Sequence, residues 1–170
     1  MSSFEERSQA LIDGLNDIKL DHVIYVPCST MARVIGHFEG NSDVLTFPVT
    51  REEEGVGIAS GLSLGGKRPI MVIQDNGLGN SLTALTTFPQ AYHIPLLLLV
   101  ARRGGLNEFN SMIHHFCEHA DDIMAAARLR CFSLDGRVDI DEGRPTVAKA
   151  YDYAEITHRP VTLFTNLMGG

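Results

Sequence analysis

Three consecutive glutamates, Glu52, Glu53 and Glu54, begin a segment rich in glycine, alanine and serine, EEEGVGIASGLSLGG. Carboxylates in the first turn of a helix are stabilised by the helix dipole, by about 0.3–1 kcal/mol each. Thr50 followed by Glu53 also matches a capping box, in which each side chain bonds the backbone N–H of the other residue. These structural roles explain Glu53 and Glu54. They would also cover Glu52, so its role stays open between starting a helix and transferring a proton.

Glycine recurs through the helix that these acids begin and in the next loop. Gly57 and Gly61 lie four residues apart in the helix, although glycine costs about 1 kcal/mol relative to alanine there. Such a helix is tolerated where another backbone or a ligand approaches closely. A second glycine-rich turn, QDNGLGNSL at 74–82, offers backbone N–H groups that cradle an anion, or is an ordinary tight turn. It matches neither the Rossmann fingerprint nor the Walker loop.

Histidines and a cysteine offer other chemistry. His115 and His119 are spaced four apart, as two metal ligands on one helix face would be, but no third ligand stands at a suitable spacing. We therefore expect no metal site in this chain. Cys28 follows a strand-like run and is either a nucleophile, with His114 as its base, or a small packing residue.

Two adjacent cations, Arg102 and Arg103, follow the most apolar run of the chain. A substrate with a sulfonate or phosphonate beside its carboxylate requires cations of this kind, the more so in an acidic protein. The alternative is that both are ordinary surface charges.

Strand-like and helical segments alternate along the chain and would position these residues. This alternation predicts an α/β fold with a doubly wound, mainly parallel six-stranded sheet, helices on both faces and one domain over residues 1–170. The strands are expected at 22–27, 43–48, 69–74, 95–101, 129–134 and 160–165, and the helices at 3–17, 30–39, 51–65, 79–92, 110–127 and 144–157.

Ligands of such sheets bind beyond the carboxyl ends of the strands, where the strand order reverses. The loops at that edge are PCST, PVTREEE, QDNGLGN and RRGGLNEFN, which carry the candidate residues described above. The sequence therefore predicts that these residues gather at one edge of the sheet.

Composition narrows the class of protein. A net charge of −7 argues against nucleic acid or an anionic membrane as a partner. The longest apolar run, 94–101, is too short to span a bilayer, and the charged N-terminal segment lacks the apolar stretch of a signal peptide. The three cysteines include no CxxC pair, so we expect neither a disulfide framework nor a zinc ribbon. We expect a reduced, cytoplasmic protein.

Three segments carry a resemblance to a known family, in this order: REEEGVGIASGLSLGGKRP, QDNGLGNSLTAL and YHIPLLLLVARRG. Through them the chain resembles the pyrimidine-binding domain of thiamine-diphosphate-dependent 2-oxoacid decarboxylases. The phosphonopyruvate and sulfopyruvate decarboxylase branch is the most similar, and PCST matches its first loop. In that family an activating glutamate precedes a helix glycine by nine positions, which selects Glu52 through Gly61. The resemblance implies that its carboxylic acid bonds N1′ of the cofactor's aminopyrimidine and activates the cofactor for attack on a 2-oxo group.

The resemblance also assigns roles to the other candidates. It implies that the cofactor is thiamine diphosphate and that histidines after the fourth strand handle protons. NEFNSMIHH departs from the branch's acidic-Pro-Gln-His loop, so either His114 or His115 corresponds to the histidine of that loop. The implied residues are Glu52, His114 and His115 for catalysis, Pro27, Cys28, Glu52, Asn76, Gly77, Gly79 and Asn80 for the cofactor, and Ser29, Arg102 and Arg103 for the substrate.

The family binds the cofactor diphosphate and Mg²⁺ through a second domain with a Gly-Asp-Gly motif, which does not occur in this sequence. We therefore expect an alpha subunit that is active only with a beta subunit carrying that site, and that self-associates through the glycine-rich helix. Sulfopyruvate is the expected substrate and phosphonopyruvate the alternative. The competing hypotheses are a non-catalytic binding or regulatory module and a cofactor-free hydrolase that uses Cys28.

Overall fold

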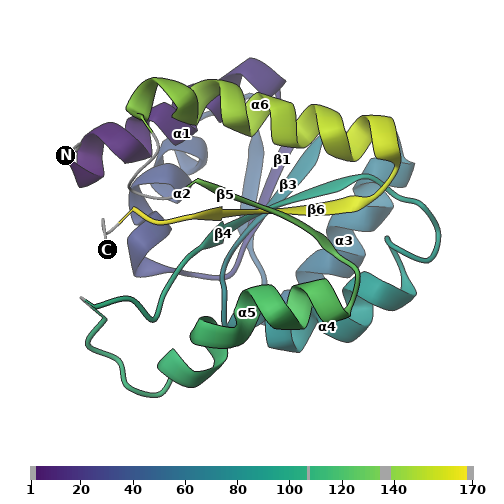
Figure 1. Ribbon diagram of the computed structural model, residues 1–170. Helices are drawn as coiled ribbons and strands as arrows, with labels where there is room; N and C mark the ends of the chain where they lie inside the picture. The colour runs from purple at the N-terminus through teal and green to yellow at the C-terminus, as the bar shows by residue number, and fades with distance from the viewer. Residues whose placement is uncertain (1–2, 107, 135–138, 168–170) are drawn as a thin grey trace.

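A computed structural model describes residues 3–106, 108–134 and 139–167. Its centre is one sheet in which all neighbouring strands are parallel, in the order β2-β1-β3-β4-β6-β5 (Figure 1). The strands are β1 His22–Tyr25, β2 Leu45–Pro48, β3 Pro69–Gln74, β4 Leu96–Ala101, β5 Arg130–Leu134 and β6 Pro160–Thr165. The expected doubly wound sheet is confirmed, and each strand lies within its expected range.

Helices cover both faces of this sheet, with α1, α2 and α6 on one face and α3, α4 and α5 on the other (Figure 1). Parallel strands require such helical crossover connections, since the chain must return to the same end of the sheet before the next strand begins. The helices are α1 Phe4–Ile18, α2 Ala32–Glu39, α3 Glu52–Leu64, α4 Gly77–Thr87, α5 His114–Ala126 and α6 Ile140–Thr157, and a 3-10 turn, Ser29–Met31, precedes α2.

Alternate residues of the central strands enter two separate cores. In β4, Leu97 and Leu99 pack towards α1, α2 and α6, whereas Leu96, Leu98 and Val100 pack towards α3, α4 and α5. Side chains of a strand point alternately to opposite faces, so a sheet covered on both sides needs continuous apolar runs. This burial holds the carboxyl ends of β1, β3 and β4 as a rigid edge for the loops that follow.

Helices α4, α5 and α6 differ most from their expected bounds, and α5 begins at His114 instead of at 110. Helix α4 begins at Gly77 and ends at Thr87, before Pro89, whereas the expected range was 79–92. Helix α6 begins at Ile140 with Asp139 as its N-cap and contains Pro145 in its second turn. The expected start at 144 was wrong, because the helix accommodates Pro145 in its second turn and not in its first, where the missing N–H of proline is normally tolerated.

Within the described part of the chain, the structure contains no helix with the length and apolar character needed to cross a membrane.

Candidate functional site

Glu52 is the first residue of α3 and lies just beyond the carboxyl end of β2, with its side chain buried. The Nδ2 of Asn80 donates a hydrogen bond of 2.9 Å to Glu52 Oε2. A Cβ placed on Gly77 would lie 2.5 Å from Glu52 Oε1, so only glycine leaves room for this carboxyl group. The expected site residues Glu52, Gly77 and Asn80 are therefore in direct contact, although they belong to two different helices.

The three glutamates diverge, and the expected capping box is wrong. The N-cap residue is Arg51, whose Nε lies 2.5 Å from Glu53 Oε1. Glu54 takes the capping role instead, because its Oε2 accepts hydrogen bonds from both the N–H and the hydroxyl of Thr50, at 3.2 and 2.9 Å. Because Arg51 and not Thr50 is the N-cap, the third residue of the helix is Glu54, and its side chain is the one that reaches back to Thr50. Of the three, only the Glu52 side chain is buried as a whole, although Oε2 of the partly exposed Glu53 is also buried and has no partner among the described residues.

The glycines of α3 divide between an inner and an outer face. A Cβ on Gly55 would lie 2.7 Å from Cε of buried Met71, so this glycine lets the helix pack closely on the sheet. Gly57 and Gly61 are exposed, and a Cβ on either would meet no described atom within 4 Å. Close packing on β3 thus explains why residue 55 is glycine. No contact within the described chain requires glycine at positions 57 and 61.

The turn between β3 and α4 presents both paired and unpaired polar groups. Asp75 is fully buried, and its carboxylate accepts the backbone N–H of Arg103 at 2.8 Å. Among the described residues, no donor reaches the buried Oδ1 of Asn76. A buried acceptor without a partner costs free energy, so it marks a place where a ligand can supply the missing donor.

Arg103 is held by the protein's own side chains. Its Nε and Nη2 lie 2.5 and 2.9 Å from the two carboxylate oxygens of Glu108, and its Nη1 donates to Gln74 at 3.0 Å. Both side chains of the ion pair are nearly buried, at 10% and 6% exposed. The Arg103 guanidinium lowers the pKa of Glu108 to about 2, so this carboxylate stays charged and keeps the cation occupied at neutral pH.

Arg102 is more accessible to a ligand. Its guanidinium donates to Asp121 at 2.8 and 3.1 Å and lies 3.9 Å from the centre of the Phe164 ring. The Asp121 side chain is 60% exposed, and exposed ion pairs contribute about 0–1 kcal/mol. A bound anion can therefore replace Asp121 at little cost.

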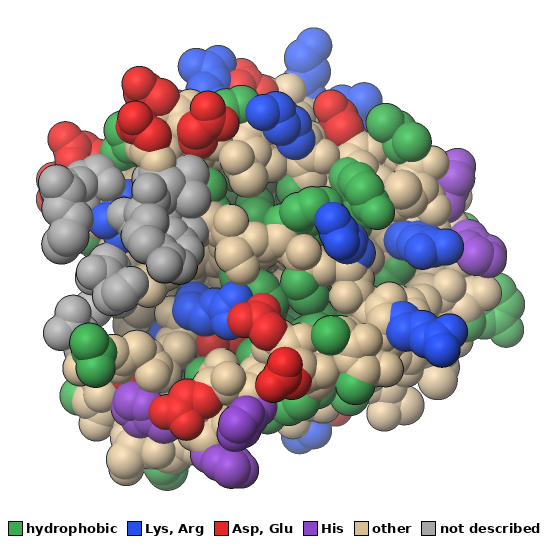
Figure 2. Space-filling model, in the orientation of Figure 1, with side chains coloured by type: hydrophobic (Ala, Val, Ile, Leu, Met, Phe, Trp, Pro, Cys, Tyr) green, Lys and Arg blue, Asp and Glu red, His purple; other side chains and the backbone are tan. Residues whose placement is uncertain are grey.

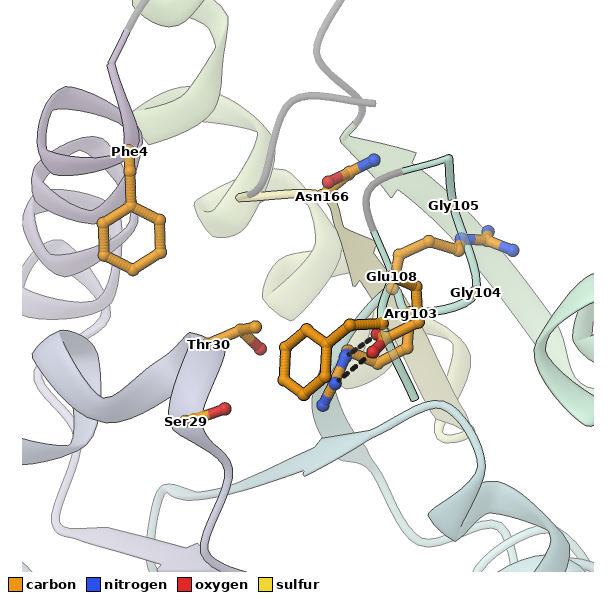
Figure 3. Close-up of a pocket in the computed structure, with 10 residues that line it drawn as sticks. Phe4, Ser29, Thr30, Arg103, Gly104, Gly105, Glu108 and Asn166 are labelled. Carbon is orange, nitrogen blue, oxygen red and sulfur yellow. Dashed lines mark hydrogen bonds and ion pairs between the residues drawn. The ribbon is translucent and has the colours of Figure 1, made fainter. Parts of the chain in front are cut away.

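A pocket of about 250 Å³ opens at this edge of the sheet, beyond the ends of β1, β4 and β6 (Figure 3). Figure 3 shows Ser29 and Thr30 on one side and the Arg103–Glu108 pair on the other. The lining consists of Phe4, Ser29, Thr30, Arg102, Arg103, Gly104, Gly105, Glu108, Phe109 and Asn166. All three expected substrate residues line this pocket, whereas Glu52 does not.

The remaining expected cofactor residues are Pro27 and Cys28, in the loop after β1, and Gly79, in α4. Cys28 is buried, with its Sγ 3.1 Å from the Thr30 hydroxyl, and Pro27 before it is exposed. Burial and this local contact favour the role of a small packing residue for Cys28 over that of a nucleophile. A Cβ on Gly79 would lie 3.0 Å from the Phe116 ring, so this glycine allows α5 to approach α4.

The histidines gather where α5 begins, at the lower left of Figure 2. His114 lies 3.3 Å from the backbone oxygen of Glu108 through its Nε2, which places it behind the loop that lines the pocket. The rings of His115 and His119 meet edge to face, with centroids 5.4 Å apart, on the exposed side of the helix. The residues that the structure describes include no group of three or more side chains arranged to hold a metal ion.

Sequence reasoning missed Asp75, Glu108 and Cys117. Asp75 directly follows a buried strand, where a charged residue is unusual, but two of its three hydrogen-bond donors, Arg103 and Cys117, are far away in the sequence. Glu108 sits in the RRGGLNEFN loop, and its pairing with Arg103 is visible only once the loop has folded back.

Comparison with protein families gives one match over most of the chain. The model described as "Thiamine pyrophosphate enzyme, N-terminal TPP binding domain" matches residues 6–125. A solved 2-oxoglutarate:ferredoxin oxidoreductase from Magnetococcus marinus has a similar fold, with a TM-score of 0.66 at 16% identity over 94% of this chain and 28% of that chain.

Several curated proteins are similar in sequence. The chain is 38% identical over 101 residues to sulfopyruvate decarboxylase subunit alpha of Methanococcus maripaludis, which covers 59% of this chain and 60% of that protein. It is 36% identical to the same subunit of Methanothermobacter thermautotrophicus, over 61% of this chain and 63% of that one. Phosphonopyruvate decarboxylase of Streptomyces viridochromogenes is 30% identical over 62% of this chain and 26% of its own length. The matched region thus spans less than two thirds of each of these relatives.

Proposed function

We infer the function from the family, since the chain belongs to the thiamine pyrophosphate enzymes, as their N-terminal TPP binding domain. We propose that it is the alpha subunit of a two-chain thiamine-diphosphate-dependent 2-oxoacid decarboxylase that converts sulfopyruvate to sulfoacetaldehyde and CO₂. Two relatives with 38% and 36% identity carry the name sulfopyruvate decarboxylase subunit alpha, which supports both the reaction and the role of a subunit.

The single observation that carries the proposal is the buried Glu52 carboxyl group against Gly77. One of its oxygens is held by Asn80, and the other lies where no side chain fits on the neighbouring helix. The orphaned Oδ1 of Asn76 is in the same turn. An acidic group, an unpaired acceptor and a backbone without a side chain fit an aminopyrimidine, which has both donor and acceptor atoms on a flat ring.

In this proposal Glu52, Asn76, Gly77 and Asn80 hold the pyrimidine half of thiamine diphosphate. When bound, the cofactor supplies a nucleophilic carbon and an acceptor for the electrons released with CO₂. Glu52 holds a proton at Oε1 and shares it with a ring nitrogen, while the Asn80 bond fixes the carboxyl group in place. Removal of bulk water by burial strengthens that hydrogen bond.

The pocket beside this site is proposed to bind the substrate. Ser29 supplies a hydroxyl, and Arg102 supplies the cation that meets the distal anion, because its partner Asp121 is exposed and exchangeable. Arg103 is kept as a wall of the pocket by Glu108. The resemblance to phosphonopyruvate decarboxylase makes a phosphonate the second candidate for the same subsite.

The remaining parts of the active site are assigned to a partner. We propose that a beta subunit binds the cofactor diphosphate and Mg²⁺, since the family uses a Gly-Asp-Gly motif that does not occur in this sequence. The exposed glycines Gly57 and Gly61 are proposed to receive a second copy of the chain, because a bare helix face allows another backbone to approach closely.

The test is reconstitution with a partner chain that carries the Gly-Asp-Gly motif. With thiamine diphosphate and Mg²⁺ present, the assembly should release CO₂ from sulfopyruvate faster than from phosphonopyruvate or pyruvate. An assembly with Glu52→Gln serves as the control for adventitious decarboxylation. A stable assembly that binds the cofactor and decarboxylates none of the three acids would favour a non-catalytic module instead.

A further inference from the structure

Asp75, at the carboxyl end of β3, is a fully buried carboxylate that accepts hydrogen bonds from the next residue and from two distant segments, the loop after β4 and α5. Its Oδ2 accepts the backbone N–H of Arg103 at 2.8 Å. Its Oδ1 accepts the backbone N–H of Asn76 at 3.0 Å and the thiol of Cys117 at 2.9 Å. A buried carboxylate needs such donors because the loss of water is otherwise uncompensated.

Each donor belongs to a segment of the proposed active site. Asn76 directly precedes Gly77, which packs against the Glu52 carboxyl group. Arg103 begins the loop that forms one wall of the pocket. Cys117 lies one turn after His114 on α5. Asp75 is thus the common anchor of the cofactor turn, the pocket loop and the histidine helix.

Packing around Cys117 leaves little freedom in this arrangement. A Cβ on Gly104, which has a positive φ of 76°, would lie 2.8 Å from the Cβ of Cys117. Burial, followed by the hydrogen bond to Asp75, raises the pKa of the Cys117 thiol well above its usual range. Cys117 therefore stays protonated as a donor to Asp75, and it is not a thiolate nucleophile.

We propose that Asp75 is a positioning residue that sets the Asn76–Gly77 turn against Glu52 and, through Cys117, fixes the start of α5 beside the pocket. The role in catalysis rests on the proposed function, whereas the mechanical link between the three segments does not. Asp75 touches neither the pocket nor the Glu52 carboxyl group directly, so its effect on the reaction is transmitted through the residues that it holds.

The link is tested on the full chain by residue-resolved amide hydrogen exchange. Cys117→Ala removes one donor to Asp75 and should speed exchange at the amides of Asn76 and Arg103 by about tenfold relative to amides of β6. Cys117→Ser keeps a donor and should restore protection. Cys131→Ala removes a half-buried cysteine outside the network and should leave both amides unchanged. Unchanged exchange in Cys117→Ala would overturn the proposal.

The consequence for catalysis is tested in the assembled enzyme. Asp75→Asn places an amide N–H₂ against donors, so it should lower kcat at least tenfold with little change in KM, and Cys117→Ala should lower kcat by less. If Asp75→Asn does not fold, the Cys117 pair still decides the question. Faster local exchange with an unchanged kcat would overturn the positioning role. An inactive wild-type assembly would contradict the proposed function instead, while the exchange experiment would still decide the link.

Discussion

Glu52 combines burial with a single hydrogen bond, so its second oxygen is available to a ligand. Glu52→Gln keeps the size of the side chain and its contact with Asn80 but has no acidic proton. In the assembled enzyme we therefore expect cofactor C2-proton exchange to fall by at least about 100-fold, the usual lower range for loss of an acid–base group. Exchange is followed by NMR in deuterated buffer.

The neighbouring acids provide the matched control for this prediction. Glu53 pairs with Arg51 and Glu54 with Thr50, and both side chains are more exposed than that of Glu52. Glu53→Gln and Glu54→Gln should therefore leave C2-proton exchange within about twofold of the wild type, since surface changes have small effects. Normal exchange in Glu52→Gln together with loss in either control would show that the wrong glutamate has been assigned.

Arg102 and Arg103 differ in how firmly each is paired, and this difference predicts which one selects the substrate. Arg102→Ala should lower kcat/KM for sulfopyruvate by about 10- to 100-fold, corresponding to the loss of one charge-assisted hydrogen bond. The loss for pyruvate should be small, because pyruvate has no distal anion. Equal losses for both acids, measured by steady-state kinetics, would make Arg102 structural or a ligand of the shared carboxylate.

The Arg103–Glu108 pair predicts a specific response to acid. The pKa of Glu108 is about 2 in the folded chain against an ordinary value of 4.5, so the unfolded chain binds this proton more readily. The pair therefore stabilises the fold fully above about pH 4.5, and this contribution is lost as the pH falls towards 2.

Glu108→Gln removes this titration, so its free energy of unfolding should decline less steeply than that of the wild type between pH 4.5 and pH 2. Urea unfolding followed by circular dichroism gives the two curves. Glu54→Gln, at an exposed carboxylate that bonds only Thr50, should retain the wild-type slope. Parallel curves for the Glu108 variant and the wild type would show that the pair contributes little.

Helix α3 has one face committed to the sheet and one face that is bare. On the bare face, Gly61→Ala should raise the free energy of unfolding of the isolated chain by about 0.5–1 kcal/mol, because alanine is the better helix former. The bulkier Gly61→Leu should weaken self-association, as measured by sedimentation, if a second copy packs on this face.

A helix glycine in a close contact gives the opposite expectation. A Cβ on Gly14 of α1 would lie 2.8 Å from the backbone oxygen of Arg144 and from Cβ of Val147 in α6. Gly14→Ala should therefore destabilise the chain, because the two helices would have to separate. If Gly61→Leu left the association state unchanged, the outer glycines of α3 would need another explanation.

At the scale of the molecule, the sheet brings the buried Glu52 carboxyl group and a pocket lined by Arg102 and Arg103 to one edge, yet the family's diphosphate motif does not occur in the sequence. The purified chain should therefore fold and show no decarboxylation of sulfopyruvate or phosphonopyruvate, even with thiamine diphosphate and Mg²⁺. Turnover by the isolated chain, measured as CO₂ release, would contradict the proposed division of the active site between two subunits.

The sequence by itself determined the sheet, because the apolar runs of β3, β4 and β6 are continuous, and β3 and β4 are each followed by a helix that returns the chain to the same end of the sheet. It also singled out Glu52, though only through a resemblance: local spacing could not separate it from Glu53 and Glu54. Local rules failed at the capping box, where they chose Glu53 over Glu54, and at Pro145, which lies inside α6.

The tertiary structure alone decided which charged side chain each arginine is paired with and how exposed that pair is. Arg102 and Arg103 are equivalent in the sequence, but Asp121 is exposed while Glu108 is nearly buried, so their ion pairs differ in how easily a ligand can replace them. Asp75 acquires its role only when β3, the loop after β4 and α5 meet. Hydrogen bonds between distant segments depend on packing distance, which no local pattern of residue types encodes.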